Sequence, residues 1–203
     1  MRESDVMWQI EKTVRQNGYA QIAGIDEAGR GPLAGPVVSA AVILPHDFCC
    51  PGIADSKKLS EKKRHLFFPR IMQAAVAVGV GICDHKEIDA VNILAAALLS
   101  MKRAVKNLDI APDFLLVDGK FTLSMDISQL AVIKGDTKSI SIAAASIVAK
   151  VTRDRIMTTL HQAYPVYHFI QHKGYPTVLH KKAILDHGPC PVHRRTFKGV
   201  IRP

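Results

Sequence analysis

The chain has 203 residues, of which 48% are apolar, and a formal net charge of +9. This composition is enough for a packed core in one domain spanning residues 1–203. It argues against a membrane protein, because no stretch approaches the roughly 18 apolar residues that a membrane helix needs. Residues 1–20 lack the apolar block of a signal peptide, and the four cysteines do not form a disulfide framework. We therefore expect a cytoplasmic protein and, without a dimerisation signal, a monomer.

The excess positive charge lies in the last third of the chain. Residues 137–203 hold 11 Lys and Arg against two Asp, whereas residues 1–136 hold 16 basic and 16 acidic residues. Such segregation is typical of a nucleic-acid-binding face, although an ordinary solvated basic surface is the alternative. We expect residues from about 164 to 203 to form a basic part that contacts the substrate. By charge alone, Arg194, Arg195 and Lys198 are candidates for contacts with phosphates.

The first predicted elements are two apolar strands, residues 20–25 and 37–44, joined by a Gly- and Pro-containing turn that favours an antiparallel hairpin. Asp26 and Glu27 follow the first strand. Carboxylates are the ligands that Mg²⁺ and Mn²⁺ prefer. Side chains alternate along a regular strand, so both acids can reach one ion only if the strand bulges or one residue contributes its backbone carbonyl.

Two glycines flank one arginine directly after these acids, at Gly29, Arg30 and Gly31. Glycine lets a ligand approach the backbone N–H groups closely, and the guanidinium fork of arginine matches a phosphate. An acid pair beside a phosphate cradle suggests metal-dependent phosphodiester chemistry. The simpler interpretation is an acidic turn whose glycines serve only the turn.

The remaining pattern predicts alternating helices and strands. Ser60 and Asp84 are suitable N-caps, and Glu87 completes a capping box with Asp84. The order predicts an α/β fold in which helices flank a mixed central sheet. The expected helices cover residues 61–73, 84–107, 139–161 and 178–187, and the expected strands cover residues 76–83, 114–117 and 131–133.

Two further strands end in acid, at Asp118 and Asp136. In open α/β sheets, functional sites gather beyond the carboxyl ends of the strands. If the acids of all three strands meet there, their repulsion would be relieved by one or two divalent cations, and a pair of cations can hydrolyse a phosphodiester. Cys190 and His193 look like half of a zinc site, but no second pair has matching spacing, so we do not expect zinc.

These segments resemble the ribonuclease HII family. The resemblance spans roughly residues 20 to 197 in ordered motifs. The motifs are Asp-Glu-Ala-Gly-Arg-Gly-Pro at 26–32, Asp-Ser-Lys-Lys-Leu-Ser at 55–60, Val-Asp-Gly at 117–119, Lys-Gly-Asp at 134–136, Ala-Ala-Ser-Ile-Val-Ala-Lys-Val-Thr-Arg-Asp-Arg at 144–155 and His-Lys-Gly-Tyr-Pro-Thr at 172–177.

The resemblance implies a ribonuclease H-like fold with a helical C-terminal part. It also implies an endoribonuclease that cleaves the RNA of RNA–DNA hybrids and nicks 5′ of ribonucleotides in duplex DNA, leaving 3′-OH and 5′-phosphate ends. Misincorporated ribonucleotides would be removed in this way. The implied cofactor is Mg²⁺ or Mn²⁺, and the implied metal-binding and catalytic acids are Asp26, Glu27, Asp118 and Asp136.

The resemblance assigns substrate contacts as well. The Gly29–Gly31 segment would contact the 2′-OH and the flanking phosphates, and Tyr175 would pack on the deoxyribose that follows the ribonucleotide. The 2′-OH is what distinguishes RNA from DNA locally. Lys57, which follows a loop, and Lys138 are further candidates for phosphate contacts by charge.

Two other functions stay open from the residues alone. A resolvase-like nuclease would use the same acids without reading a 2′-OH, and would cut a duplex made only of DNA. A non-catalytic nucleic-acid-binding module would use only the basic C-terminal third. The second alternative leaves the acidic strand ends unexplained, because acids without metal weaken binding to phosphates.

Overall fold

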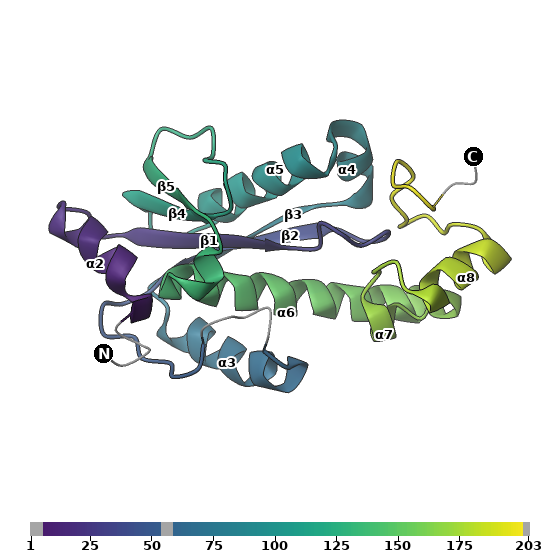
Figure 1. The fold of residues 1–203 in the computed structure, drawn as a ribbon, viewed down its shortest axis with the longest axis horizontal. Coiled ribbons are helices and arrows are strands. Elements are labelled where there is room, and N and C mark those ends of the chain that lie inside the picture. The colour runs from purple at the N-terminus through teal and green to yellow at the C-terminus, as the bar shows by residue number, and fades with distance from the viewer. Residues whose placement is uncertain (1–5, 54–58, 201–203) are drawn as a thin grey trace.

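The computed structural model describes residues 6–53 and 59–200, and Figure 1 shows their arrangement. A central sheet lies between helices on both faces, and the C-terminal helices extend beyond one end of it. The elements in chain order are α2 (Gln9–Gln16), β1 (Ile22–Ala28), β2 (Val37–Ile43), α3 (Glu61–Ala74), β3 (Ala77–Cys83), α4 (His85–Val91), α5 (Ile93–Lys106), β4 (Phe114–Asp118), β5 (Ser128–Val132), the 3-10 turn η1 (Gly135–Thr137), α6 (Ile140–Ala163), the 3-10 turn η2 (Pro165–Tyr167), α7 (Phe169–His172) and α8 (Val178–His187).

The sheet has the strand order β3-β2-β1-β4-β5. β1 pairs antiparallel with β2, and β2 pairs antiparallel with β3, so the predicted hairpin is confirmed. β4 runs parallel to β1, and β5 runs parallel to β4. The sheet is therefore mixed, as the sequence predicts, and the carboxyl ends of β1, β4 and β5 lie at the same edge.

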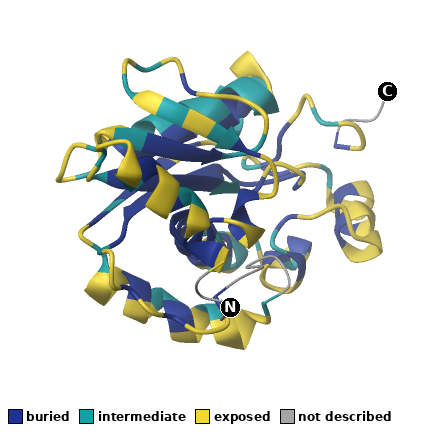
Figure 2. Cartoon of the chain, turned by 60° about the vertical axis from the view of Figure 1, so that its left-hand side comes forward, coloured by how far each residue is buried: buried dark blue, intermediate teal, exposed yellow. Residues whose placement is uncertain are grey.

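Helices α3 and α6 cover one face of the sheet, and α5 covers the other (Figure 1). Small residues at the start of α6 allow very close packing on β1: a Cβ on Gly24 would lie 2.1 Å from the backbone of Ser141. Figure 2 shows the buried residues gathered in the sheet and in α6. Such contacts leave no room for a larger side chain, so this helix fixes the position of β1.

The structure differs from the sequence predictions in five helices and strands, one of which is the short helix α7, which was not predicted. The predicted helix 84–107 is two helices, because Asn92 has a φ of 73° and its side chain caps α5. Strand β5 lies earlier than the predicted strand 131–133. β1 continues through Ala28, so Asp26 and Glu27 lie inside the strand and not after it. Helix α2 was not predicted at all.

Helix α2 is attached to the start of α6 by a buried carboxylate. One oxygen of Glu11 accepts hydrogen bonds from the Ser139 hydroxyl (2.6 Å) and from the backbone N–H of Ser141 (3.1 Å). The Glu11 side chain is fully buried, and this burial raises its pKa. Glu11 thereby satisfies a backbone donor in the first turn of α6 that has no partner within the helix.

The C-terminal part packs against the loop that follows β1. Leu33 donates its N–H to the carbonyl of Gly174, and Ala34 forms a bridge with His193. A small apolar cluster, which includes Phe169 and Ile184, supports these contacts. In the described residues no helix is both long and apolar enough to cross a membrane.

Candidate active site

The predicted acids lie at the edge where β1, β4 and β5 end. Ile25 of β1 is paired with Val117 of β4, so Asp26 and Asp118 are the next residues in register on two neighbouring strands. Asp136 lies in η1, four residues after the end of β5. The strands that carry or precede these acids are therefore neighbours in the sheet, which is the condition for the acids to meet.

Asp26 and Glu27 point to opposite faces of the sheet. The pairing of β1 with β2 runs without interruption from Ala23 to Ala28, so there is no bulge at the acids. Asp26 lies opposite Ala40, which packs in the core beneath α6. Glu27 lies opposite Ser39, whose hydroxyl bonds to Ser100 on α5. Cross-strand partners share a face, so Asp26 faces α6 and Glu27 faces α5.

Asp118 shares the face of Asp26. Leu116, two residues earlier on β4, packs against Ile142 of α6, and side chains two residues apart point to the same side of a strand. The backbone N–H of Gly135 donates a hydrogen bond of 2.7 Å to one Asp118 carboxylate oxygen. This bond connects the end of β4 to the η1 turn that carries Asp136.

The acids differ in exposure. The Asp26 side chain is fully buried and that of Asp136 is 3% exposed, whereas Glu27 and Asp118 are partly exposed. Glu27 forms an ion pair of 3.3 Å with Arg30. Buried carboxylates are costly unless cations or hydrogen-bond donors compensate them. An all-oxygen set of this kind fits hard divalent cations such as Mg²⁺ and Mn²⁺.

No three His, Cys, Asp or Glu side chains within residues 6–53 and 59–200 are grouped so that they could hold a metal ion as they stand. The assignment of the four acids as metal ligands therefore stays a prediction. Cys190 and His193, which resemble half of a zinc site in the sequence, are hydrogen-bonded instead. Nδ1 of His193 lies 3.1 Å from the sulfur of Cys190, and Nε2 of His193 lies 3.0 Å from Nε2 of His180.

The Gly29–Gly31 segment and Tyr175 lie together, as the assigned roles require. They line one pocket of about 300 Å³, which Glu27 also borders. A Cβ on Gly31 would lie 3.4 Å from the Tyr175 ring. Glu27 and Arg30 also line a second pocket of about 270 Å³ that contains Asp118. Predicted substrate-binding and predicted catalytic residues are therefore contiguous.

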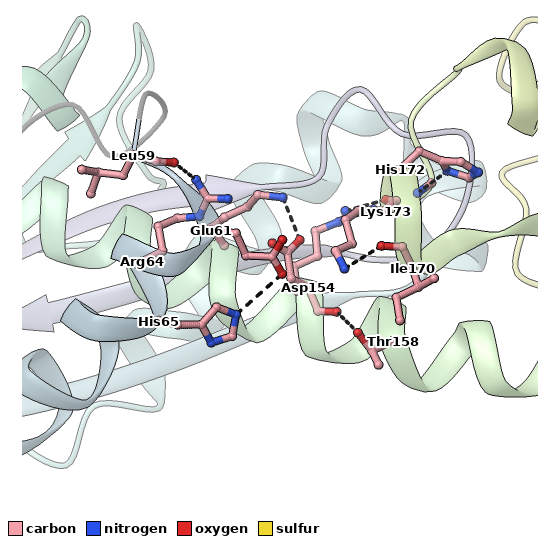
Figure 3. A network of polar contacts seen from close by, with 12 residues as sticks. Leu59, Glu61, Arg64, His65, Asp154, Thr158, Ile170, His172 and Lys173 are labelled. Carbon is pink, nitrogen blue, oxygen red and sulfur yellow. Dashed lines mark hydrogen bonds and ion pairs between the residues drawn. The ribbon is translucent and has the colours of Figure 1, made fainter.

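Three polar residues of the first pocket were not assigned a role from the sequence: Arg64 on α3, and Ser146 and Lys150 on α6. Figure 3 shows Arg64 donating to the Leu59 carbonyl beside the part of α6 that carries Asp154. Burial lowers the pKa of Lys150, which also forms an ion pair of 2.7 Å with Asp154. Ser146 and Lys150 lie four residues apart in an otherwise apolar run, and this spacing on one helix face was the available signal.

The basic residues divide into two groups. Lys138 is exposed at the end of η1, two residues from Asp136, and Arg195 and Lys198 are also exposed. Arg194 is fully buried, so the expectation of a phosphate contact from its charge is wrong. Lys57 lies outside the described residues.

The sheet, the covering helices and the helical C-terminal region are those of the ribonuclease H2 and H3 folds. The crystal structure of ribonuclease H2 from Pyrococcus horikoshii OT3 superposes with a TM-score of 0.74 at 28% identity, covering 89% of this chain and 95% of that one. A Bst ribonuclease HIII solved in complex with Mn²⁺ has a TM-score of 0.69 at 21% identity, with 92% and 70% coverage.

The sequence comparison is more specific. The family profile described as Ribonuclease HII matches residues 23–200. The chain is 55% identical over 194 residues to Ribonuclease HII of Geobacter metallireducens, covering 96% of this chain and 91% of that protein. It is 53% identical over 201 residues to Ribonuclease HII of Bacillus licheniformis, covering 98% and 78%. The chain belongs to the ribonuclease HII family, whose members are divalent-metal-dependent endoribonucleases that act on the RNA strand of RNA–DNA hybrids.

Proposed function

We propose that this enzyme nicks duplex DNA on the 5′ side of single embedded ribonucleotides, in addition to cleaving RNA–DNA hybrids, and so removes misincorporated ribonucleotides. The observation that carries this proposal is the shared pocket of Gly31 and Tyr175, which borders Glu27. A bare backbone against an aromatic ring is suited to a sugar–phosphate junction, because glycine admits the ribose and the ring packs on the next sugar.

Asp26, Glu27, Asp118 and Asp136 would hold one or two Mg²⁺ or Mn²⁺ ions. When bound, these ions would supply Lewis-acid chemistry, promoting loss of a proton from water and stabilising charge on the phosphate. The products would carry 3′-OH and 5′-phosphate ends. A structural neighbour, Bst ribonuclease HIII, was solved in complex with Mn²⁺, which supports this class of cation.

The protein groups around the pocket would position the nucleic acid. The N–H groups of the Gly29–Gly31 segment are suited to donate to the 2′-OH and a phosphate oxygen. Arg64 and Lys150 border the same pocket from α3 and α6 and would neutralise phosphate charge. Tyr175 is 43% exposed, so its ring is available for packing on a sugar. Lys138, exposed at the end of η1, would contact the nucleic-acid backbone, and Lys57 stays a candidate for a phosphate contact by charge alone.

The test uses a labelled DNA duplex with one ribonucleotide and a matched duplex made only of DNA, each with Mg²⁺, Mn²⁺ or EDTA. Wild type is compared with Asp118→Asn, whose amide oxygen can still accept the hydrogen bond from Gly135. We expect metal-dependent nicking 5′ of the ribonucleotide only, and a loss of roughly 100-fold or more in the variant, because a metal contributes several kcal/mol. Cutting of both duplexes would favour a general nuclease, and binding without cutting would favour a binding module.

A further inference from the structure

Arg194 is buried beneath the loop that follows β1, and it uses every hydrogen-bond donor of its guanidinium group on that loop. Its five bonds, between 2.6 and 3.1 Å long, all go to backbone carbonyl oxygens. A guanidinium group has five N–H donors in a fixed planar fork, so none is left for a substrate. The acceptors are the carbonyls of Gly29, Arg30, Pro32, Gly35 and Pro36.

These bonds determine which way the neighbouring N–H groups point. In a planar trans peptide, the carbonyl of one residue and the N–H of the next residue point in opposite directions. The carbonyls of Gly29 and Arg30 are directed at Arg194, so the N–H groups of Arg30 and Gly31 are directed away from it. Neither N–H donates a hydrogen bond within the described residues. Both residues line the pocket that holds Tyr175.

A second buried arginine supports the same loop and connects it to the tyrosine segment. Arg153 donates to the carbonyls of Pro36 (2.9 Å) and Ala34 (3.2 Å), and also to that of Lys173 (2.9 Å), two residues before Tyr175. Burial lowers the pKa of Arg153 to about 10 and that of Arg194 to about 9, so both arginines keep their charge at pH 7. Two positive charges therefore lie directly behind the loop.

We propose that Arg194 is a positioning residue that turns the N–H groups of Arg30 and Gly31 toward the substrate, and thereby sets the preference for ribose over deoxyribose at the nicking site. This inference rests on the proposed function, in which the Gly29–Gly31 segment reads the 2′-OH. Lysine cannot replace Arg194 here, because an ammonium group lacks the planar fork that reaches five carbonyls at once.

The primary test is Arg194→Lys, with Arg103→Lys as the matched control. Arg103 lies on α5 and does not line the pocket. It also donates to a backbone carbonyl, that of Ile82, and to a carboxylate, that of Glu87. Dissociation constants are measured in EDTA for a duplex with one ribonucleotide and for the matched duplex made only of DNA. Thermal unfolding of each variant is measured alongside.

We expect Arg194→Lys to lower the ribonucleotide preference about tenfold, because misdirected N–H groups lose hydrogen bonds to the 2′-OH and the net effect of one such bond is roughly a tenfold change in affinity. Affinity for the DNA-only duplex should change less than about twofold, since charge is retained. Arg103→Lys should keep the wild-type ribonucleotide preference and the wild-type affinity for the DNA-only duplex. A folded Arg194→Lys that keeps the full preference would overturn the inference while leaving the proposed function intact. A wild type without any preference would count against the proposed function itself.

A measurement on the wild-type protein covers the case in which Arg194→Lys does not fold. The ribonucleotide duplex is added to ¹⁵N-labelled protein in EDTA, and the backbone amide signals are followed by NMR. The signals of Arg30 and Gly31 should move with the ribonucleotide duplex and move less with the DNA-only duplex. Equal movement with both duplexes would contradict a role of these N–H groups in reading the ribose.

Discussion

The backbone N–H of Gly135 and the carboxylate of Asp118 are joined by a hydrogen bond of 2.7 Å, although Asp118 ends β4 and Gly135 lies in the η1 turn that follows β5. The two residues are also in close steric contact: a Cβ on Gly135 would lie 3.2 Å from the bonded Asp118 oxygen and 2.5 Å from Cδ1 of Ile142. The position of one predicted catalytic acid therefore depends on the absence of a side chain on the neighbouring turn.

This contact predicts the effect of Gly135→Ala. The added methyl group should cost about 1–3 kcal/mol of stability through overpacking against Ile142, and should displace the Asp118 carboxylate. The double variant Gly135→Ala/Ile142→Val removes the clashing Cδ1 atom. We expect the double variant to recover most of the loss in unfolding midpoint that Gly135→Ala causes, but little of the loss in cleavage rate. Recovery of both together would show that the contact with Asp118 has no influence on activity.

The two glycines around Arg30 should respond differently to alanine. Gly29 has a φ of +102°, and a Cβ there would lie 2.1 Å from Nε of Arg153. Gly31 would meet only the Tyr175 ring, at 3.4 Å. Gly29→Ala should therefore lower the free energy of unfolding by a few kcal/mol, roughly 1–3 from backbone strain alone.

Gly31→Ala should instead leave the unfolding midpoint nearly unchanged and weaken cleavage at an embedded ribonucleotide. Denaturant titration and steady-state kinetics of both variants separate these effects. If Gly31→Ala lost stability as Gly29→Ala does, or kept wild-type KM and kcat, the assignment of Gly31 to the substrate pocket would be wrong.

Three buried histidines predict a loss of stability in mild acid. Burial lowers the pKa of His172 and of His193 to about 4, and lowers that of His180 as well. Because the folded pKa lies below the unfolded value of 6.5, their contribution is fully present above pH 6.5 and is lost as the pH falls toward 4. The slope should be about 1.4 kcal/mol per pH unit for each histidine that titrates.

The measurement is urea unfolding at pH 7.0 and in steps below it. Glu11 acts in the opposite direction, because its raised pKa makes stability fall as the pH rises above 4.5, so the series is run in a Glu11→Gln background. His172→Gln should reduce the slope, because it removes one of the three buried histidines whose pKa is lowered. A slope unaffected by His172→Gln would refute this origin of the acid sensitivity.

Glu11 itself gives a further prediction. Glu11→Ala removes the acceptor for Ser139 and for the Ser141 N–H, and a buried donor without a partner costs about 1–3 kcal/mol. Glu11→Gln keeps an oxygen acceptor and removes a buried charge, so it should be close to neutral or stabilising at pH 7. Chemical denaturation of both variants checks this. If both variants lost the same free energy of unfolding, the charge of Glu11 and not its hydrogen-bond acceptor would be what stabilises the fold.

Most of the strands could be predicted because they depend on local pattern, and the same pattern placed the acids near strand ends, although their role as metal ligands stays a prediction. The apolar runs before Asp118 and Asp136 indicate where strands end, and this can be seen without knowing which strands pair in the sheet. Asn92 was missed because the apolar periodicity continues across it, and only its positive φ and its cap on α5 reveal the break. Helix α2 was missed for a related reason: the burial of Glu11 depends on Ser139, which is 128 residues away.

Arg194 illustrates the same limit at the candidate site. A sequence assigns a charged residue to the surface by default, because burial of a charge is costly. Its burial here depends on five carbonyls from a loop that the sequence presents only as a turn. Arg64 and Lys150 likewise reach the pocket only through the packing of α3 against α6.

The separation between Gly29 and Arg194 has a consequence for synthesis of the protein. The two residues lie 165 positions apart, yet the loop after β1 takes its shape from bonds to Arg194. A chain emerging from the ribosome holds its acids and glycines long before it holds this arginine. The loop after β1 would therefore reach the shape described here only once translation has passed Arg194.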